Sequence, residues 1–136
     1  VKHTHHNHEL DTPGKDSFQH RQAGAAAVGI LSPQLTALFV PETRAESDEM
    51  RYRRFEQAFR DCDLIVVEGD LNTSAPRVEV WRSTVGERPY AVSDSDIRAV
   101  VSDEQIRDVN CPIWKRSDVA VVAAEVIQMM QLGDRQ

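Results

Sequence analysis

The sequence has little cysteine, no long apolar run and no excess of basic residues. Its 136 residues include two cysteines, Cys62 and Cys111, which lie far apart and form no CxxC pair. A disulfide framework or a four-cysteine zinc site is therefore excluded, and a reducing compartment, the cytoplasm, is expected. No run approaches the roughly 18 apolar residues of a membrane span. The polar, histidine-rich start does not have the pattern of a signal peptide, so we expect no membrane association.

The balance of charge points away from nucleic acid. The chain carries 16 basic and 22 acidic residues, for a net charge of −6. Broad nucleic-acid binding needs a basic face that displaces counterions, so this class of function is not expected. Hydrophobic residues at 40% with 28% charged residues are typical of a soluble globular protein of about one domain.

Short apolar runs alternate with helical patterns, which predicts a three-layer α/β domain with a mostly parallel sheet. The most diagnostic run is 64–67 (Leu-Ile-Val-Val), because apolar side chains on both faces are typical of a strand covered on both sides. The other predicted strands cover 26–31, 35–40, 78–81, 97–101 and 113–114, and the predicted helices cover 16–23, 48–60 and 118–131.

A carboxylate and a glycine, Glu68 and Gly69, follow the run 64–67. Ligands of open α/β sheets gather at the carboxyl ends of the strands, and Mg²⁺ prefers oxygen ligands. The pair therefore suits a nucleotide-bound Mg²⁺ ion, although a polar residue that simply ends a strand is an equally good reading.

The stretch around Lys15 and Asp16 is similar to the end of a phosphate-binding loop, GxxxxGK[ST], but fails that pattern twice. Glu9 stands where the first glycine is required, and Asp16 stands where serine or threonine is required. The start of the helix could still hold an anion beside Lys15 or a metal beside Asp16. A plain helix cap is the alternative.

All five histidines lie near the start of the chain, which suggests a metal site. They are His3, His5, His6, His8 and His20. Neutral imidazole suits zinc or nickel, but no carboxylate or cysteine completes an evident tetrahedral set. Loop histidines without a metal are the alternative.

Ser102 and Asp103 follow the buried strand predicted at 97–101. An aspartate in that place can accept hydrogen bonds from the N1–H and the exocyclic amine of guanine, which distinguishes guanine from adenine. A capping aspartate in a loop is the alternative.

Several stretches taken together resemble one known family. They are Val1-Lys2-His3-Thr4-His5-His6, Asp11-Thr12-Pro13-Gly14-Lys15-Asp16-Ser17, His20-Arg21-Gln22-Ala23-Gly24-Ala25, Asp63-Leu64-Ile65-Val66-Val67-Glu68-Gly69 and Ala99-Val100-Val101-Ser102-Asp103. Their order and spacing over residues 1 to 103 resemble the molybdopterin-guanine dinucleotide biosynthesis protein B (MobB) family, a small P-loop GTP-binding group. The resemblance implies a P-loop NTPase-like fold in which 63–69 is the Walker B strand.

The resemblance also implies a function in molybdenum cofactor biosynthesis. It implies binding of GTP with Mg²⁺, at most a weak GTPase activity, a homodimer, and a guanylyltransferase partner that joins GMP to molybdopterin. Glu68 would serve Mg²⁺ directly or through water, and Gly69 would give the γ-phosphate close access. Asp16 would be a second metal-side carboxylate, with Lys15 beside the nucleotide.

The remaining candidate residues take looser roles from the resemblance. Ser102 and Asp103 would lie near guanine. His3, His5 and His6 would belong to a mobile loop beside the phosphates.

Two departures from the family pattern affect these expectations. An aromatic-basic pair commonly follows Glu-Gly in the family, whereas this chain has Asp70-Leu71-Asn72. The family also begins with a strand, a Walker A loop and a helix ahead of the Val-Lys-His segment, and these are absent from the 136 residues. The Walker A loop supplies the backbone cradle for the phosphates. We therefore expect residues 1–136 to form a single, N-terminally incomplete nucleotide-binding domain that binds GTP very weakly as given.

Two other interpretations stay open at the level of sequence. One is a non-catalytic dimerisation or partner-binding module that no longer binds nucleotide. The other is a histidine-rich metal-binding protein.

Overall fold

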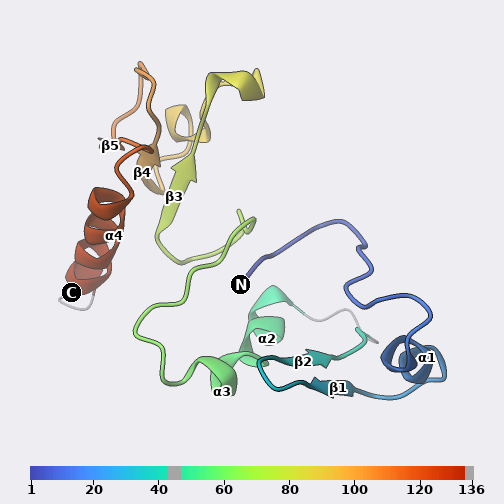
Figure 1. Cartoon of the computed structure of the whole chain (residues 1–136). Helices are drawn as coiled ribbons and strands as arrows, with labels where there is room; N and C mark the ends of the chain where they lie inside the picture. Colours follow the sequence, from blue (N-terminus) through green and yellow to red (C-terminus); the bar gives the residue numbers. More distant parts are fainter. Residues whose placement is uncertain (43–46, 134–136) are drawn as a thin grey trace. The chain divides into compact units, whose positions relative to one another are not determined.

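The computed structural model describes residues 1–42 and 47–133. The chain divides into two compact units, Val1–Asp70 (unit 1) and Leu71–Gln136 (unit 2), and each is described by itself. Figure 1 shows the elements along the chain.

The described residues of unit 1 form three short helices and one β-hairpin, labelled in Figure 1. They are α1 (Asp16–Gln22), β1 (Val28–Leu31), β2 (Thr36–Phe39), α2 (Asp48–Arg53) and α3 (Glu56–Phe59). β1 and β2 pair antiparallel, with Val28 opposite Phe39. The Ser32 hydroxyl accepts a hydrogen bond from the Leu35 amide at 2.9 Å and donates to the Leu35 carbonyl, which closes the turn between the strands.

The helix predicted over 48–60 is two helices in the structure. α2 begins after Ser47, whose side chain accepts a hydrogen bond from the Met50 amide. The amides of Arg54 and Phe55 then bond to carbonyls three residues earlier, so the backbone tightens and α2 ends. α3 resumes the helix, and the rings of Phe55 and Phe59 stack with their centroids 5.6 Å apart.

The prediction of a buried strand at 64–67 is wrong. These residues have no strand pairing of their own, and the exposed fractions of their side chains run from 36% at Leu64 to 65% at Val66. Apolar composition predicts burial on both faces, but the cover is partial, since Ile65 and Val67 line a hollow beside Phe55 and Phe59 and still remain exposed. The backbone of the run meets another segment at the Val66 carbonyl, which accepts from the Val1 nitrogen, and just after the run at an isolated parallel bridge between Lys2 and Glu68.

Unit 2 is built on a parallel sheet in the order β3-β4-β5 (Figure 1). Its elements are β3 (Arg77–Val80), the 3-10 helices η1 (Ser83–Val85) and η2 (Tyr90–Val92), β4 (Ile97–Val101), β5 (Ile113–Trp114) and α4 (Val119–Gly133). β4 lies between the other two strands and is the buried one, since Ala99 and Val100 are fully enclosed. The strands predicted at 78–81, 97–101 and 113–114 agree with β3, β4 and β5 to within one residue.

Two polar contacts fix the loops of unit 2 to this sheet. Arg77, at the start of β3, donates to both carboxylate oxygens of Asp94 at 2.8 and 3.0 Å. The Glu79 carboxylate accepts hydrogen bonds from the amides of Tyr90 and Ala91, where η2 begins. Ala91 packs with Ile97 and Val100 to form the core of the unit.

The predicted α/β class with a parallel sheet is confirmed by unit 2. None of the helices in the described part of the chain is long and apolar enough to cross a membrane.

Candidate functional site

The first three residues lie alongside the end of the apolar run, so two segments 65 residues apart in sequence meet. The Val1 nitrogen donates to the Val66 carbonyl at 2.6 Å. The Glu68 amide donates to the Val1 carbonyl at 2.8 Å, and the His3 amide donates to the Glu68 carbonyl at 2.7 Å. These bonds alternate between the two segments as in a parallel ladder. They fix the backbone on which Glu68 stands.

Gly69 allows this close approach. Its φ angle is +89°, and a Cβ atom at this position would lie 2.4 Å from the His3 carbonyl oxygen. A side chain is thus excluded both by the left-handed backbone and by direct contact. The Glu68–Gly69 bend therefore packs directly against the backbone of the N-terminal segment.

The Glu68 side chain is free to bind a ligand. It is exposed, and within the described residues it makes no hydrogen bond or ion pair. A free carboxylate on a fixed backbone is a suitable oxygen ligand for Mg²⁺.

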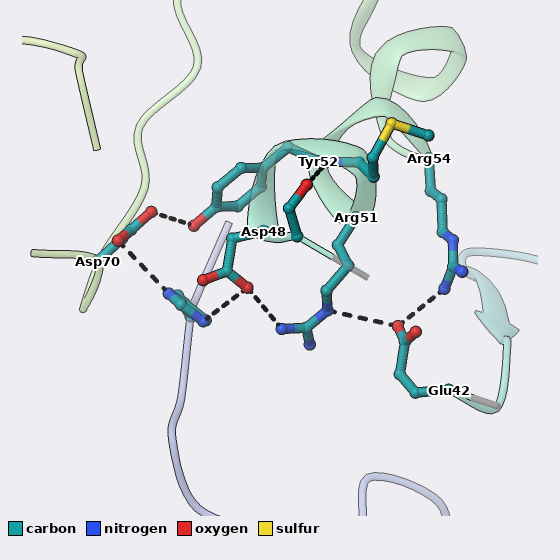
Figure 2. Close-up of polar contacts among 9 residues, drawn as sticks. Glu42, Asp48, Arg51, Tyr52, Arg54 and Asp70 are labelled. Atoms are coloured by element: carbon teal, nitrogen blue, oxygen red, sulfur yellow. Dashed lines mark hydrogen bonds and ion pairs between the residues drawn. The ribbon is translucent and has the colours of Figure 1, made fainter. Parts of the chain in front are cut away.

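A polar cluster adjoins the Glu68–Gly69 bend (Figure 2). The Tyr52 hydroxyl, from α2, donates to Asp70 Oδ2 at 2.8 Å. His3 lies between two carboxylates, with Nδ1 3.9 Å from Asp70 Oδ1 and Nε2 3.6 Å from Asp48 Oδ1. Burial, and then the hydrogen bond to Asp70, raise the pKa of Tyr52 to about 12. The phenol therefore stays protonated and acts as the donor.

The cluster continues across the surface of unit 1 through arginines. Arg51 pairs with Asp48 at 2.8 Å and with Glu42 at 3.5 Å, and Arg54 also pairs with Glu42 at 2.8 Å. Figure 2 shows these contacts in sequence. Hydrogen bonding to Asp48 raises the pKa of Arg51. The arginines of α2 are thus engaged by acids of unit 1, which disfavours a basic phosphate-binding surface on this helix.

Lys15 and Asp16 lie at the start of α1 and do not reach the Glu68–Gly69 bend. Lys15 occupies the N-cap position without a capping hydrogen bond from its side chain, and both residues are exposed. No hydrogen bond or ion pair in the described part of unit 1 joins either residue to Glu68.

The stretch before α1 is held by residues other than those predicted. Asp11 is buried, and its Oδ1 accepts from the Thr12 amide at 2.8 Å and from the Ser17 hydroxyl at 3.0 Å. Glu9, which stands where a phosphate loop needs glycine, pairs with Arg21 at 2.6 Å. That hydrogen bond is the main cause of a lowered pKa for Glu9. The stretch is therefore a turn held by the side chains of Glu9 and Asp11. The sequence signal for it is an aspartate directly before the Thr12-Pro13-Gly14 turn.

The other predicted histidines are exposed. The ring of His5 lies 4.8 Å from that of His3, and His6 lies against His8 at 5.8 Å, both between centroids. Across residues 1–42 and 47–133, no group of three or more histidine, cysteine or acidic residues is arranged to hold a metal ion.

Ser102 and Asp103 stand at the carboxyl end of β4, as predicted, but both are engaged within unit 2. Ser102 is 2% exposed, and its hydroxyl accepts from the Glu104 amide. Asp103 accepts from the Ser117 amide at 2.8 Å and from Arg116 Nε at 3.2 Å. The bonds from Ser117, and then that from Arg116, lower the pKa of Asp103. A guanine base would have to displace or share these donors.

Comparisons with known proteins agree on one family. The model of the family described as molybdopterin guanine dinucleotide synthesis protein B matches residues 1–103. A molybdopterin-guanine dinucleotide biosynthesis adapter protein of Escherichia coli K12 is 33% identical over 132 residues, which cover 96% of this chain and 75% of that protein. The protein of the same name in Haemophilus influenzae is 26% identical over 116 residues, or 81% of this chain and 64% of that protein. The α/β fold with its parallel sheet agrees with this match, and the chain belongs to the MobB family.

Proposed function

We propose that this chain is an adapter of molybdopterin-guanine dinucleotide synthesis that binds GTP with Mg²⁺ and assists the guanylyltransferase. One observation carries the proposal. The N-terminal segment Val1–His3 and the Walker B-like segment ending at Glu68 hydrogen-bond side by side, and the Glu68 carboxylate is left free beside a glycine. A free carboxylate on a fixed backbone is an arrangement that a cation can approach.

The candidate residues of unit 1 would have different roles in binding the nucleotide and its metal. Glu68 would hold Mg²⁺ directly or through a bound water, because an exposed carboxylate fits a hard cation. The resemblance places Gly69 near the γ-phosphate, and in this structure its missing side chain accommodates the His3 carbonyl oxygen. Lys15 and Asp16 would have to reach the nucleotide from α1 as exposed, unpaired side chains. When bound, Mg²⁺ neutralises phosphate charge.

For unit 2 taken by itself, the family resemblance implies that Asp103 lies near guanine. Asp103 would accept from the base, with Ser102 held behind it in the buried end of β4. The Ser117 amide keeps Asp103 ionised and oriented, since hydrogen bonds to a carboxylate favour its charged form. Asp103→Asn is expected to reduce the preference for GTP over ATP.

The test of the nucleotide proposal compares two glutamates. Mg²⁺-dependent binding of a fluorescent GTP analogue is measured on the 136-residue chain and on the full product of its gene. We expect weak binding by the 136 residues alone, since they contain no GxxxxGK[ST] pattern. In the full product, Glu68→Gln should weaken Mg²⁺-dependent binding about tenfold, as for other changes around a metal. Glu56→Gln, an exposed acid on α3, is the matched control. Equal effects of the two changes would refute the role of Glu68.

A guanylyltransferase partner is the second part of the proposal. Calorimetric titration of the purified guanylyltransferase with this protein should give a saturable complex, with or without nucleotide. Absence of a complex at micromolar concentrations would remove the adapter function while leaving nucleotide binding untouched.

The homodimer implied by the family has support in the hairpin of unit 1. Leu31, Leu35 and Leu38 have exposed fractions of 84%, 76% and 68%, and such apolar exposure favours burial between copies. Sedimentation equilibrium should give twice the monomer mass. Leu38→Glu should lower the measured mass to that of the monomer. A wild-type protein that sediments as a monomer would refute the dimer.

A further inference from the structure

Asp70 is the residue at which this chain departs from the family pattern, and the structure gives it defined partners. It directly follows Gly69, and its side chain is 4% exposed. Its Oδ2 accepts a hydrogen bond of 2.8 Å from the Tyr52 hydroxyl of α2 (Figure 2). A buried carboxylate without partners would be costly, so this hydrogen bond is part of what makes an acid tolerable there.

The neighbouring His3 is held less tightly by the same cluster. Its side chain is 8% exposed, and its Nδ1 lies 3.9 Å from Asp70 Oδ1, which is too long for a hydrogen bond. Nδ1 has no hydrogen-bond partner in the described chain. Between these two neighbours of Asp70, Tyr52 makes the well-formed hydrogen bond, and His3 faces Asp70 across a gap.

The backbone of the Glu68–Gly69 bend needs restraints both before and after Gly69. On one side, the Glu68 amide and carbonyl are bonded to Val1 and His3. At the other side lies Gly69, whose missing side chain gives the backbone more freedom than other residues have. The side chain of Asp70 secures the chain just after that glycine.

We propose that Asp70 and Tyr52 are positioning residues, whose hydrogen bond fastens the Glu68–Gly69 bend to α2 and so aims the Glu68 carboxylate. The inference rests on the proposed nucleotide function of Glu68, but the fastening itself is a property of unit 1 that is measurable without nucleotide. α2 is a suitable support, because Ser47 caps its start and Tyr52 stands on its last turn.

The first experiment measures the bend itself. Amide hydrogen exchange of His3 and Glu68 is recorded in the wild type and in Tyr52→Phe, which removes one hydroxyl. We expect exchange at both amides to rise about tenfold, the effect of losing roughly 1.4 kcal/mol of local protection. The matched control is Tyr90→Phe in unit 2, at a tyrosine that is 60% exposed. Unchanged exchange in a folded Tyr52→Phe protein would overturn the proposal.

The second experiment reads the hydrogen bond directly. In the Tyr90→Phe background Tyr52 is the one remaining tyrosine, since the sequence contains two. Tyrosinate absorbance after rapid pH jumps, recorded before unfolding, should titrate with a pKa of about 12. Asp70→Ala should lower this midpoint and loosen the bend, whereas Asp70→Asn, whose amide oxygen can still accept, should keep the bend protected. Equal loss in both Asp70 variants would assign the effect to charge and overturn the proposal.

The third experiment separates the two hypotheses. Binding of a fluorescent GTP analogue to the full gene product is measured with and without Mg²⁺. Tyr52→Phe should weaken the Mg²⁺-dependent part about tenfold, at the low end for residues that orient metal ligands. If the wild type binds no nucleotide, the proposed function fails, and the exchange and titration results still decide whether the bend is fastened. If it binds and Tyr52→Phe binds equally well, the positioning role fails alone.

Discussion

Replacing Gly69 by alanine is the sharpest perturbation of the candidate site. The residue has a φ of +89°, and an added Cβ would lie 2.4 Å from the His3 carbonyl oxygen, a backbone atom. Gly24 offers a matched control in the same unit, because its φ is +92° but no atom lies within 4 Å of the corresponding Cβ. The two substitutions share the backbone strain and differ in the contact with His3.

The magnitudes follow from these two terms. A left-handed backbone costs a residue with a Cβ about 1–2 kcal/mol, and this applies to both variants. In Gly69→Ala the contact also forces His3 away from Glu68, which breaks the hydrogen bond of 2.7 Å between them. Losing that bond costs about 1 kcal/mol, and losing all three bonds of the N-terminal segment costs about 3 kcal/mol. Gly69→Ala should therefore be less stable than Gly24→Ala by about 1–3 kcal/mol.

Urea unfolding followed by far-ultraviolet circular dichroism gives this difference, and hydrogen exchange at the His3 amide locates it. Protection of that amide should fall in Gly69→Ala and persist in Gly24→Ala. Equal stabilities and equal protection in the two variants would refute the close approach of Gly69 to the N-terminal segment.

Three further outcomes are expected. Ser47→Ala should lower the free energy of unfolding by about 0.5–1 kcal/mol in urea, because α2 loses its side-chain cap. An unchanged free energy of unfolding would show that the cap does not stabilise unit 1. Arg77 lowers the pKa of Asp94, so this pair stabilises unit 2 above the ordinary aspartate pKa, and the contribution is lost as pH falls through the lowered folded value. Acid unfolding followed by tryptophan fluorescence should lose this dependence in Asp94→Asn, and an unaltered acid transition would contradict it. The pKa of Tyr52 is raised from 10.0 to about 12, so its contribution is complete below the ordinary value and disappears as pH rises through about 12. Tyr52→Phe should reduce the loss of stability between pH 10 and about 12. An unchanged dependence of stability on alkaline pH would count against the hydrogen bond to Asp70.

Local patterns predicted most elements because their causes are local. Short apolar runs predicted β1, β2 and β4, and a helical pattern of apolar residues predicted α4. The break between α2 and α3 was missed because the apolar spacing of Tyr52, Phe55 and Phe59 continues through it. Nothing in that spacing indicates that the amides of Arg54 and Phe55 bond to carbonyls three residues earlier instead of four.

The run 64–67 failed for a different reason. Composition shows that side chains are apolar, but burial depends on what packs against them, and these side chains are exposed in the described chain. The pairing of Glu68 with Val1 and His3 was likewise beyond local patterns, since it joins distant segments. The family resemblance gave the order of these segments along the sequence, but it did not predict that they are in contact.

For the candidate site, the sequence predicted which residues belong to it better than it predicted their hydrogen-bond partners. Glu68 and Gly69 were singled out from a carboxylate and glycine after an apolar run, and the structure places them at a fixed bend. Asp70 was noted only as a departure from the family, because its partner Tyr52 lies 18 positions earlier on a helix. Asp103 was predicted as a base reader, and its hydrogen bond with Ser117 follows from a loop that no local pattern connects to it.

The most direct test of the central proposal locates the bound metal. Mn²⁺ with GTP is added to the isotope-labelled full product of the gene, and paramagnetic broadening of the amide resonances is recorded. If Glu68 holds the metal of the nucleotide, the amides of His3 and Gly69 broaden first, and Glu68→Gln shifts this broadening to about tenfold higher Mn²⁺ concentration. If those amides stay sharp while resonances elsewhere in the chain broaden, the Glu68–Gly69 bend is not the metal-nucleotide site.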